Sequence, residues 1–186
     1  MLDMNSILPE KPYDALIATI TSTYDQGRLR AVQAVNVQLL ETYWQIGRHI
    51  VEFEQAGSAK AGYGKSLIKQ LATDLTLRFG KGFSRSNLIR IRQFYLLYPK
   101  GASLPHFLTW THVVEFLKID DPLERSFYEQ QCSRERWSVR ELMRQKNSAL
   151  FLRLAASTDK EGILRLAQQG QLIEQPGDLL REPYVF

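Results

Sequence analysis

The chain has a single cysteine, Cys132, among 186 residues. One cysteine excludes an internal disulfide framework, cannot complete a structural zinc site, and indicates a reducing compartment. The three histidines, His49, His106 and His112, lack the spacing of metal ligands. No apolar run approaches the roughly 20 residues that span a bilayer, and the N-terminus lacks the basic-then-apolar pattern of a signal peptide. We therefore expect a cytoplasmic protein without a membrane partner.

The chain also has few residue patterns that could carry chemistry. The Gly-Lys-Ser sequence at 64–66 resembles the end of a phosphate-binding loop, but position 59 is alanine and the preceding segment has a helical pattern. The acidic pair at 120–121 lies at a predicted helix start, where capping accounts for it. We expect His112, beside Trp110, to be packed or hydrogen-bonded. No catalytic residue and no cofactor is therefore expected in this chain.

Apolar residues recur at intervals of three and four along most of the chain, which predicts helices rather than strands. The expected fold class is all-α, as a multi-helix domain with one or two helix-turn-helix-like units. This domain should cover 1–168, divisible into sub-units 1–100 and 106–168, with a linker over 169–186. The hydrophobic content of 44% is enough for one sizeable core or two small ones.

Two helices are predicted before residue 56. Pro12 suits the first turn of an opening helix that carries Leu16, Ile20 and Tyr24. A longer helix should run from about 27 to 54. Its apolar stripe consists of Val32, Val35, Leu39, Tyr43, Ile46 and Ile50. A helix of this length is either buried across the domain or provides a dimer seam, so a homodimer through 27–54 is one open arrangement.

Further helices are predicted in the C-terminal half. A short helix should begin near residue 110, and Pro122 should lie in the first turn of the next one. Ser138 and Glu141 form a capping box that opens a helix continuing to about residue 154. A final short helix is predicted over 159–168.

The segment 66–98 has the pattern of two helices joined by a turn. Apolar residues at helical spacing predict a first helix that ends at Gly80. The turn, residues 80–83, has the length expected of a helix-turn-helix. Ser84 is a suitable N-cap for the second helix, and Pro99 ends it.

The second helix of this pair has an apolar face and a polar, basic face. Its apolar face is predicted to contain Leu88, Ile91, Tyr95 and Tyr98. In a helix-turn-helix the N-terminal residues of the second helix contact base edges in the major groove. Arginine binds guanine, asparagine binds adenine, and serine can hold a phosphate. The candidate base readers are Arg85, Asn87 and Arg90; Ser84 and Ser86 accompany them, and the candidate backbone contacts are Lys65, Lys69, Lys81, Arg92 and Arg140.

Positive charge is concentrated in this region. Residues 60–100 hold nine basic side chains and one acid, Asp74, for a net of +8, whereas the whole chain has +4. Residues 134–153 hold six basic and two acidic side chains, for a net of +4. Such concentration is typical of a phosphate-binding surface. If the two segments share a face they form one track; otherwise Arg140 and Arg144 should pair with Glu141 and its neighbours.

Five ordered blocks resemble a known family. The blocks are Trp44-Gln45-Ile46-Gly47-Arg48; Tyr63-Gly64-Lys65; Gly82-Phe83-Ser84 with Asn87-Leu88 and Phe94-Tyr95; Leu108-Thr109-Trp110-Thr111-His112; and Trp137-Ser138-Val139-Arg140-Glu141-Leu142. Together, over about 13–154, they resemble the N-terminal domain of the YhcG-like family. The resemblance implies a helical DNA-binding domain that precedes a PD-(D/E)XK nuclease domain in longer relatives, and a role in defence against foreign DNA. It points again to residues 84–92 as a recognition helix, and also to Arg140.

The last residues, 183–186, resemble the junction at which the nuclease domain of such relatives begins. A nuclease of that class needs an acidic residue and an acidic-x-lysine pair on adjacent strands, whose carboxylates hold a divalent metal, and no such strand pair is predicted here. We therefore expect a non-catalytic DNA-binding domain that targets a nuclease to its substrate, with duplex DNA as partner. The alternative is a helical dimerisation or protein-docking module that assembles the nuclease.

Overall fold

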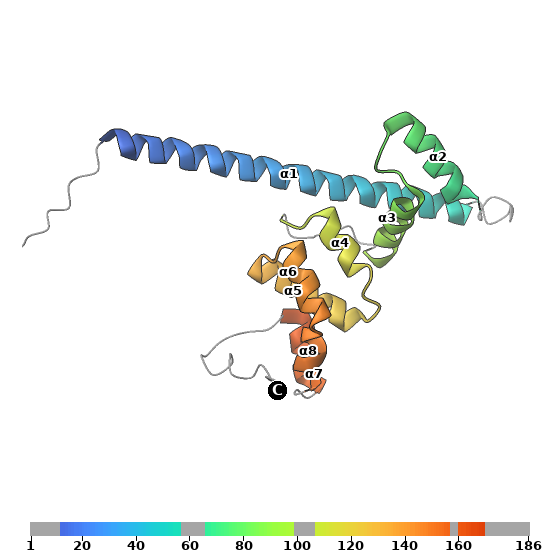
Figure 1. Cartoon of the computed structure of the whole chain (residues 1–186). Coiled ribbons are helices and arrows are strands. Elements are labelled where there is room, and N and C mark those ends of the chain that lie inside the picture. The colour runs from blue at the N-terminus through green and yellow to red at the C-terminus, as the bar shows by residue number, and fades with distance from the viewer. Residues whose placement is uncertain (1–11, 57–65, 99–106, 157–159, 170–186) are drawn as a thin grey trace, which may run out of the picture. The chain divides into compact units, whose positions relative to one another are not determined.

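The structure is a computed structural model that describes residues 12–56, 66–98, 107–156 and 160–169. These residues form eight helices and no strand (Figure 1). The helices are α1 (Pro12–Ala56), α2 (Leu67–Phe79), α3 (Arg85–Leu97), α4 (Trp110–Phe116), α5 (Pro122–Glu135), α6 (Val139–Asn147), α7 (Leu150–Ala156) and α8 (Lys160–Gln169). The predicted all-α class is confirmed.

Internal contacts divide the chain into two compact units, Met1–Val35 and Asn36–Phe186. The N-terminal part of α1 belongs to the first unit, and the rest of α1 with α2 to α8 belongs to the second. The sub-unit boundary predicted between 100 and 106 lies outside the described residues. So does the predicted linker, except for Gln169, which ends α8.

The two helices predicted before residue 56 are in fact one, because α1 continues for 45 residues (Figure 1). No proline interrupts α1 after its first residue. Gly27 lies inside it, and an interior glycine costs only about 1 kcal/mol relative to alanine. The hydroxyls of Thr19 and Thr23 donate to carbonyl oxygens four residues earlier, at 2.9 and 2.8 Å. A lone glycine therefore does not mark a helix boundary here.

The predicted apolar stripe of α1 is buried only toward its C-terminal end. Val32 and Val35 are 59% and 66% exposed, whereas Ile50 is 5% exposed. Tyr43 and Ile46 pack with Ile50 into a cluster with residues of α2 and α3. The interpretation of 27–54 as buried throughout is therefore wrong, and a dimer seam cannot use its full length either.

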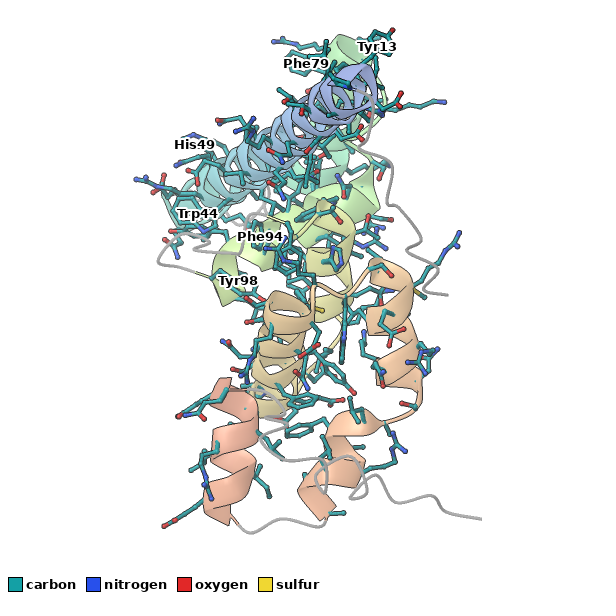
Figure 2. The ribbon with its side chains drawn as sticks, turned by 90° about the vertical axis from the view of Figure 1, so that its left-hand side faces the viewer. Tyr13, Trp44, His49, Phe79, Phe94 and Tyr98 are labelled. Atoms are coloured by element: carbon teal, nitrogen blue, oxygen red, sulfur yellow. The ribbon has the colours of Figure 1, made fainter. Side chains whose placement is uncertain are left out.

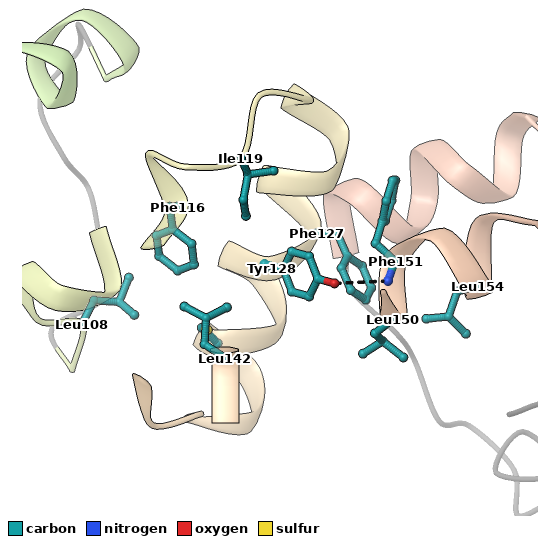
Figure 3. Close-up of a cluster of buried hydrophobic side chains, with 10 residues drawn as sticks. Leu108, Phe116, Ile119, Phe127, Tyr128, Leu142, Leu150, Phe151 and Leu154 are labelled. Atoms are coloured by element: carbon teal, nitrogen blue, oxygen red, sulfur yellow. Dashed lines mark hydrogen bonds between the residues drawn. The ribbon is translucent and has the colours of Figure 1, made fainter. Parts of the chain in front are cut away.

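The largest cluster of buried apolar side chains lies in the second unit and joins α4, α5, α6 and α7 (Figure 3). The rings of Phe127 and Tyr128 are 5.2 Å apart, and Phe127 packs against Phe151 at 5.4 Å. The Tyr128 hydroxyl accepts from the Phe151 N–H at 3.4 Å and donates to the Gln145 carbonyl oxygen at 3.3 Å. These bonds satisfy a buried hydroxyl that would otherwise destabilise the core.

The single helix predicted from 138 to about 154 is divided into α6 and α7. The division lies at Ser148 and Ala149, and Ala149 has φ of 52°, in the left-handed region. This backbone turns the chain so that Leu150 and Phe151 join the buried cluster. Neither glycine nor proline stands at the break; the local signal for it is Asn147 followed by Ser148, two residue types common in turns.

α1 and α3 lie in close contact at Gly47. A Cβ at this position would lie 2.4 Å from the Ile91 carbonyl oxygen and 2.9 Å from the Tyr95 Cβ. Both distances are shorter than van der Waals contact, so only glycine allows this approach. One turn earlier the Trp44 ring packs against Tyr95, with centroids 5.1 Å apart. The contact between α1 and α3 therefore depends on glycine at position 47.

We predict that Gly47→Ala destabilises the fold by about 1–3 kcal/mol, because the added methyl group collides with the backbone of α3. The measurement is the free energy of unfolding in urea, followed by circular dichroism. Gly27→Ala is the matched control, since a Cβ at Gly27 has no neighbour within 4 Å. The control should keep or slightly gain stability, and an equal loss in both variants would contradict the account.

Candidate nucleic-acid interface

α2 and α3 are joined by a tight turn at the predicted position. Gly80 and Gly82 have φ of 78° and 121°, which favours glycine at both positions. The Gly80 N–H donates to the Thr76 carbonyl oxygen at 2.9 Å. The Ser84 hydroxyl accepts from the Asn87 N–H at 3.2 Å and caps α3. The predicted glycine stop and serine cap are confirmed, and together they fix the start of α3.

One face of α3 is buried. Leu88, Ile91 and Phe94 are fully buried, and Tyr95 and Tyr98 are half-buried. Phe94 was missing from the predicted face, although it lies three residues after Ile91. The side chains on the opposite face are consequently directed away from the core.

Two tryptophans hold the buried face in place. The Trp44 indole N–H of α1 donates to the Tyr98 carbonyl oxygen at 2.7 Å, and the Tyr98 ring packs on Phe94 at 5.4 Å (Figure 2). Trp110, the first residue of α4, lies 5.6 Å from Phe94 and 4.7 Å from Tyr43, ring to ring. Because α1 and α4 both contact it, α3 has a fixed rotation about its own axis.

Asn87 is a predicted base reader, but both ends of its side-chain amide are used inside the protein. Its Nδ2 donates to the Gly82 carbonyl oxygen at 2.6 Å, and its Oδ1 accepts from the Trp110 indole N–H at 2.9 Å. The side chain is half-buried. Asn87 therefore holds the turn and α4 against the first turn of α3, which is a positioning role.

The exposed face of α3 carries Arg85, Ser86, Ile89 and Arg90. Within the described residues, neither Arg85 nor Arg90 has an ion pair or a side-chain hydrogen bond. Each guanidinium is thus available for a phosphate or a guanine. Ile89, which is 44% exposed, lies on the same face but is not among the predicted contact residues. The sequence signal that points to Ile89 is its position four residues after Arg85 and one residue before Arg90, on the same face of the helix.

Arg85 lies near Lys69 of α2, which is one of the residues predicted to contact the DNA backbone. Arg85 and Lys69 line one surface depression of about 670 Å³, together with Ala72, Thr73, Thr76 and Leu77. Cationic side chains and hydroxyl groups are the usual partners of phosphate oxygens. The structure therefore brings two of the predicted cationic residues to one place.

The remaining predicted residues of this region differ in their surroundings. Arg92 is half-buried, and its Nε lies 2.6 Å from the Glu54 carboxylate of α1, so its charge is compensated internally. Lys81 is exposed in the turn, and Ser84 is exposed but engaged as the cap. Lys65 lies outside the described residues.

Two of the six basic side chains in the second basic segment, residues 134–153, form ion pairs within the described residues. Arg144 lies 2.6 Å from Glu141, and Lys146 lies 3.2 Å from the Glu115 carboxylate. Arg140 is exposed on α6, a helix that packs against α4 and α7. Pairing with Glu141 is confirmed for Arg144 but not for Arg140. A continuous basic track that joins both segments stays a prediction.

Three of the titratable groups with shifted pKa values, Tyr98, Glu129 and Cys132, lie in the interior. The Tyr98 hydroxyl donates to the Glu129 carboxylate, and burial raises the pKa of both groups. Burial, with a smaller contribution from Glu129, raises the pKa of Cys132 to about 12, so this thiol is protonated at neutral pH. No three metal-binding side chains gather anywhere in the described residues. None of the helices seen there has the length and apolarity that a bilayer crossing requires.

His112 is hydrogen-bonded, as the sequence predicted. Its Nδ1 accepts from the Thr109 N–H at 3.1 Å, and its Nε2 donates to the Trp137 carbonyl oxygen at 3.0 Å. Burial lowers the pKa of His112, and the bond to Trp137 offsets only part of that change. The neutral ring therefore caps α4 and links it to the residue before the Ser138 cap of α6.

The described residues form an all-α domain in which Lys69 and Arg78 of α2 and Arg85 and Arg90 of α3 are exposed. The family model of the DUF1016 N-terminal domain matches residues 19–153. The chain belongs to this family. It is 34% identical, over 206 aligned positions, to an Escherichia coli (strain K12) protein named Putative nuclease YhcG. The predicted resemblance to the YhcG-like family is confirmed.

The alignment with that relative covers 94% of this chain and 55% of the relative. The chain thus spans about half the length of the curated relative that it matches. No solved structure matches the chain significantly.

We predict that acid weakens the fold through His112. The pKa of His112 is lower in the folded chain than in the unfolded chain. Its contribution to the free energy of unfolding is therefore fully present above the pKa of the unfolded chain, about 6.5. It is lost as the pH falls below that value, since the unfolded chain takes up the proton first. His112→Asn should lose about 1–3 kcal/mol of unfolding free energy near neutral pH, because buried partners are left unpaired.

The measurement is the free energy of urea unfolding on both sides of that pKa. The His112→Asn variant should show a smaller fall on acidification than the wild type. His49→Asn is the control, because the His49 side chain is 75% exposed. A pH dependence that is the same in the wild type and the His112 variant would refute the assignment.

Proposed function

We propose that this chain is a DNA-binding domain in which α2 and α3 form a helix-turn-helix and α3 enters the major groove of duplex DNA. The proposal is carried by one observation: Arg85 and Arg90 are exposed and free of ion pairs within the described residues. Both lie on a helix whose opposite face is fixed by α1 and α4.

The order of groups along α3 suits base recognition. In a helix-turn-helix the first turns of the second helix reach the base edges. Arg85 and Ser86 occupy the first turn of α3, and Arg90 follows in the second. A bidentate arginine is the commonest reader of guanine, and the exposed Ile89 can contact a thymine methyl group. Asn87, with its amide engaged, is excluded from this set.

Phosphate contacts would come from basic side chains on α2, in the turn and at the start of α3. Lys69 and Arg85 share the depression between α2 and α3, and Lys81 precedes α3 in the turn. The net of +8 over residues 60–100 favours an anionic partner, and release of counterions from the DNA would supply much of the affinity. Arg140 on α6 is a further candidate if the DNA extends to that helix.

We further propose that this domain brings a nuclease to its DNA. The support is the relative named as a nuclease, of which this chain covers 55%. Cleavage, and the divalent metal it would require, would belong to the part of such a protein that lies beyond this match. The chain itself would then bind without cutting, and a role in defence against foreign DNA is consistent with that division.

We predict that Arg85→Gln with Arg90→Gln weakens binding to a duplex DNA of about two helical turns by tenfold or more, since each arginine is expected to contribute about 1–3 kcal/mol. The dependence of log K on log salt should become shallower by about one for each phosphate contact removed. Fluorescence anisotropy across a salt series measures both quantities.

The matched control is Arg48→Gln with Arg165→Gln, which removes the same charge elsewhere. Arg48 pairs with Glu52 at the surface of α1, where such pairs add little stability, and Arg165 is exposed on α8. The control should bind as the wild type does. The proposal fails if both double variants lose equal affinity, or if the wild type does not bind duplex DNA at low salt.

A further inference from the structure

The N-terminal part of α1 presents an apolar face that no other described residue covers. Residues at alternating intervals of four and three form this face, here called the seam: Tyr13, Ile17, Ile20, Tyr24, Gly27 and Ala31. The first four of them are between 46% and 68% exposed. Spacing of this kind places side chains at the a and d positions of a coiled coil, where they face a partner helix.

We propose that two copies of this chain pair antiparallel through the seam. An antiparallel coiled coil places each a residue opposite a d residue of the partner helix. When Ile20 of one copy lies opposite Tyr24 of the other, Ile17 meets Gly27. In the same register Tyr13 meets Ala31. The outer layers then each combine a large side chain with a small one, as close packing requires.

The parallel arrangement fits poorly. It would place Gly27 against Gly27 and Tyr13 against Tyr13. The first layer would leave a void, and the second would have to accommodate two large rings. An added Cβ at Gly27 has no neighbour within 4 Å in its own chain, so there is open space at this position for a partner side chain.

Charge favours the same antiparallel register. Asp14 and Arg28 both follow a d position directly and therefore occupy e positions, which flank the seam. In an antiparallel pair, e positions of the two helices lie on the same side of the interface. Asp14 of one copy is then beside Arg28 of the other, twice in each dimer. Neither residue has an ion pair among the described residues.

The seam covers residues 13–31, which is about five helical turns or 28 Å. Six layers of this length form a small interface, so the dimer should dissociate on dilution. The seam shares no residue with the exposed face of α3, and this inference does not rest on the proposed DNA binding.

Sedimentation velocity of the 186-residue chain, over a concentration range of about a hundredfold, tests the association by mass action. The wild type should shift from monomer to dimer within this range. Ile20→Glu should stay monomeric with unchanged helix content. Leu29→Glu is the control, because Leu29 is 56% exposed against 55% for Ile20 but lies on the other side of α1. This variant should dimerise as the wild type does.

Two further variants test the contact and its direction. Gly27→Phe should reduce dimerisation, because its ring would collide with Ile17 of the second copy. Asp14→Arg and Arg28→Asp should each weaken self-association. An equimolar mixture of those two should form a heterodimer, because only the antiparallel register then matches opposite charges.

The proposal is overturned if the wild type remains monomeric throughout the range, or if Ile20→Glu and Leu29→Glu affect association equally. Dimers that survive Ile20→Glu would place the contact elsewhere, and a charge-swapped mixture without heterodimers would exclude the antiparallel register. Circular dichroism of every variant confirms that α1 still folds.

Discussion

The packing of Trp110 is the interaction on which the second unit depends. Its ring belongs to two of the three buried clusters: one with Leu40, Phe94, Val113 and Leu117, and one with Ile50, Leu88 and Ile91. Its indole N–H holds the amide of Asn87 at the start of α3. Two residues later, His112 links the same helix to Trp137. One short helix thus joins α1, α3 and the segment before α6.

This junction determines which side chains of α3 can meet a partner. With Phe94 and Ile91 buried and Asn87 engaged, Arg85 and Arg90 are left on the exposed face. The basic side chains named so far also differ in whether they form ion pairs inside the protein. Arg92, Arg144 and Lys146 pair with carboxylates of the chain itself, whereas the arginines of the exposed face do not within the described residues. The amino-acid composition alone does not show which basic residues are paired. The absence of ion pairs at Arg85 and Arg90 within the described residues supports the proposed interface.

Local signals predicted much of this structure. The glycine stop after α2, the serine cap of α3 and the apolar spacing predicted the bounds of these two helices closely, because such features act within one helical turn. Two errors have physical causes. Gly27 costs too little to end α1, and the left-handed backbone at Ala149 turns the chain so that Leu150 and Phe151 pack in the buried cluster, a contact that lies beyond the reach of local sequence signals. Site residues were harder, since the engagement of Asn87 depends on Trp110, which is 23 residues away.

The central claim is that the exposed face of α3 is the DNA-contacting surface. The most direct measurement is a titration of the 15N-labelled chain with duplex DNA, followed by amide chemical shifts. The account predicts the largest changes at Arg85, Ser86, Ile89 and Arg90, with further changes at Lys69 on α2. Shifts that leave α3 unaffected and cluster on another helix, or no shifts at low salt, would contradict it.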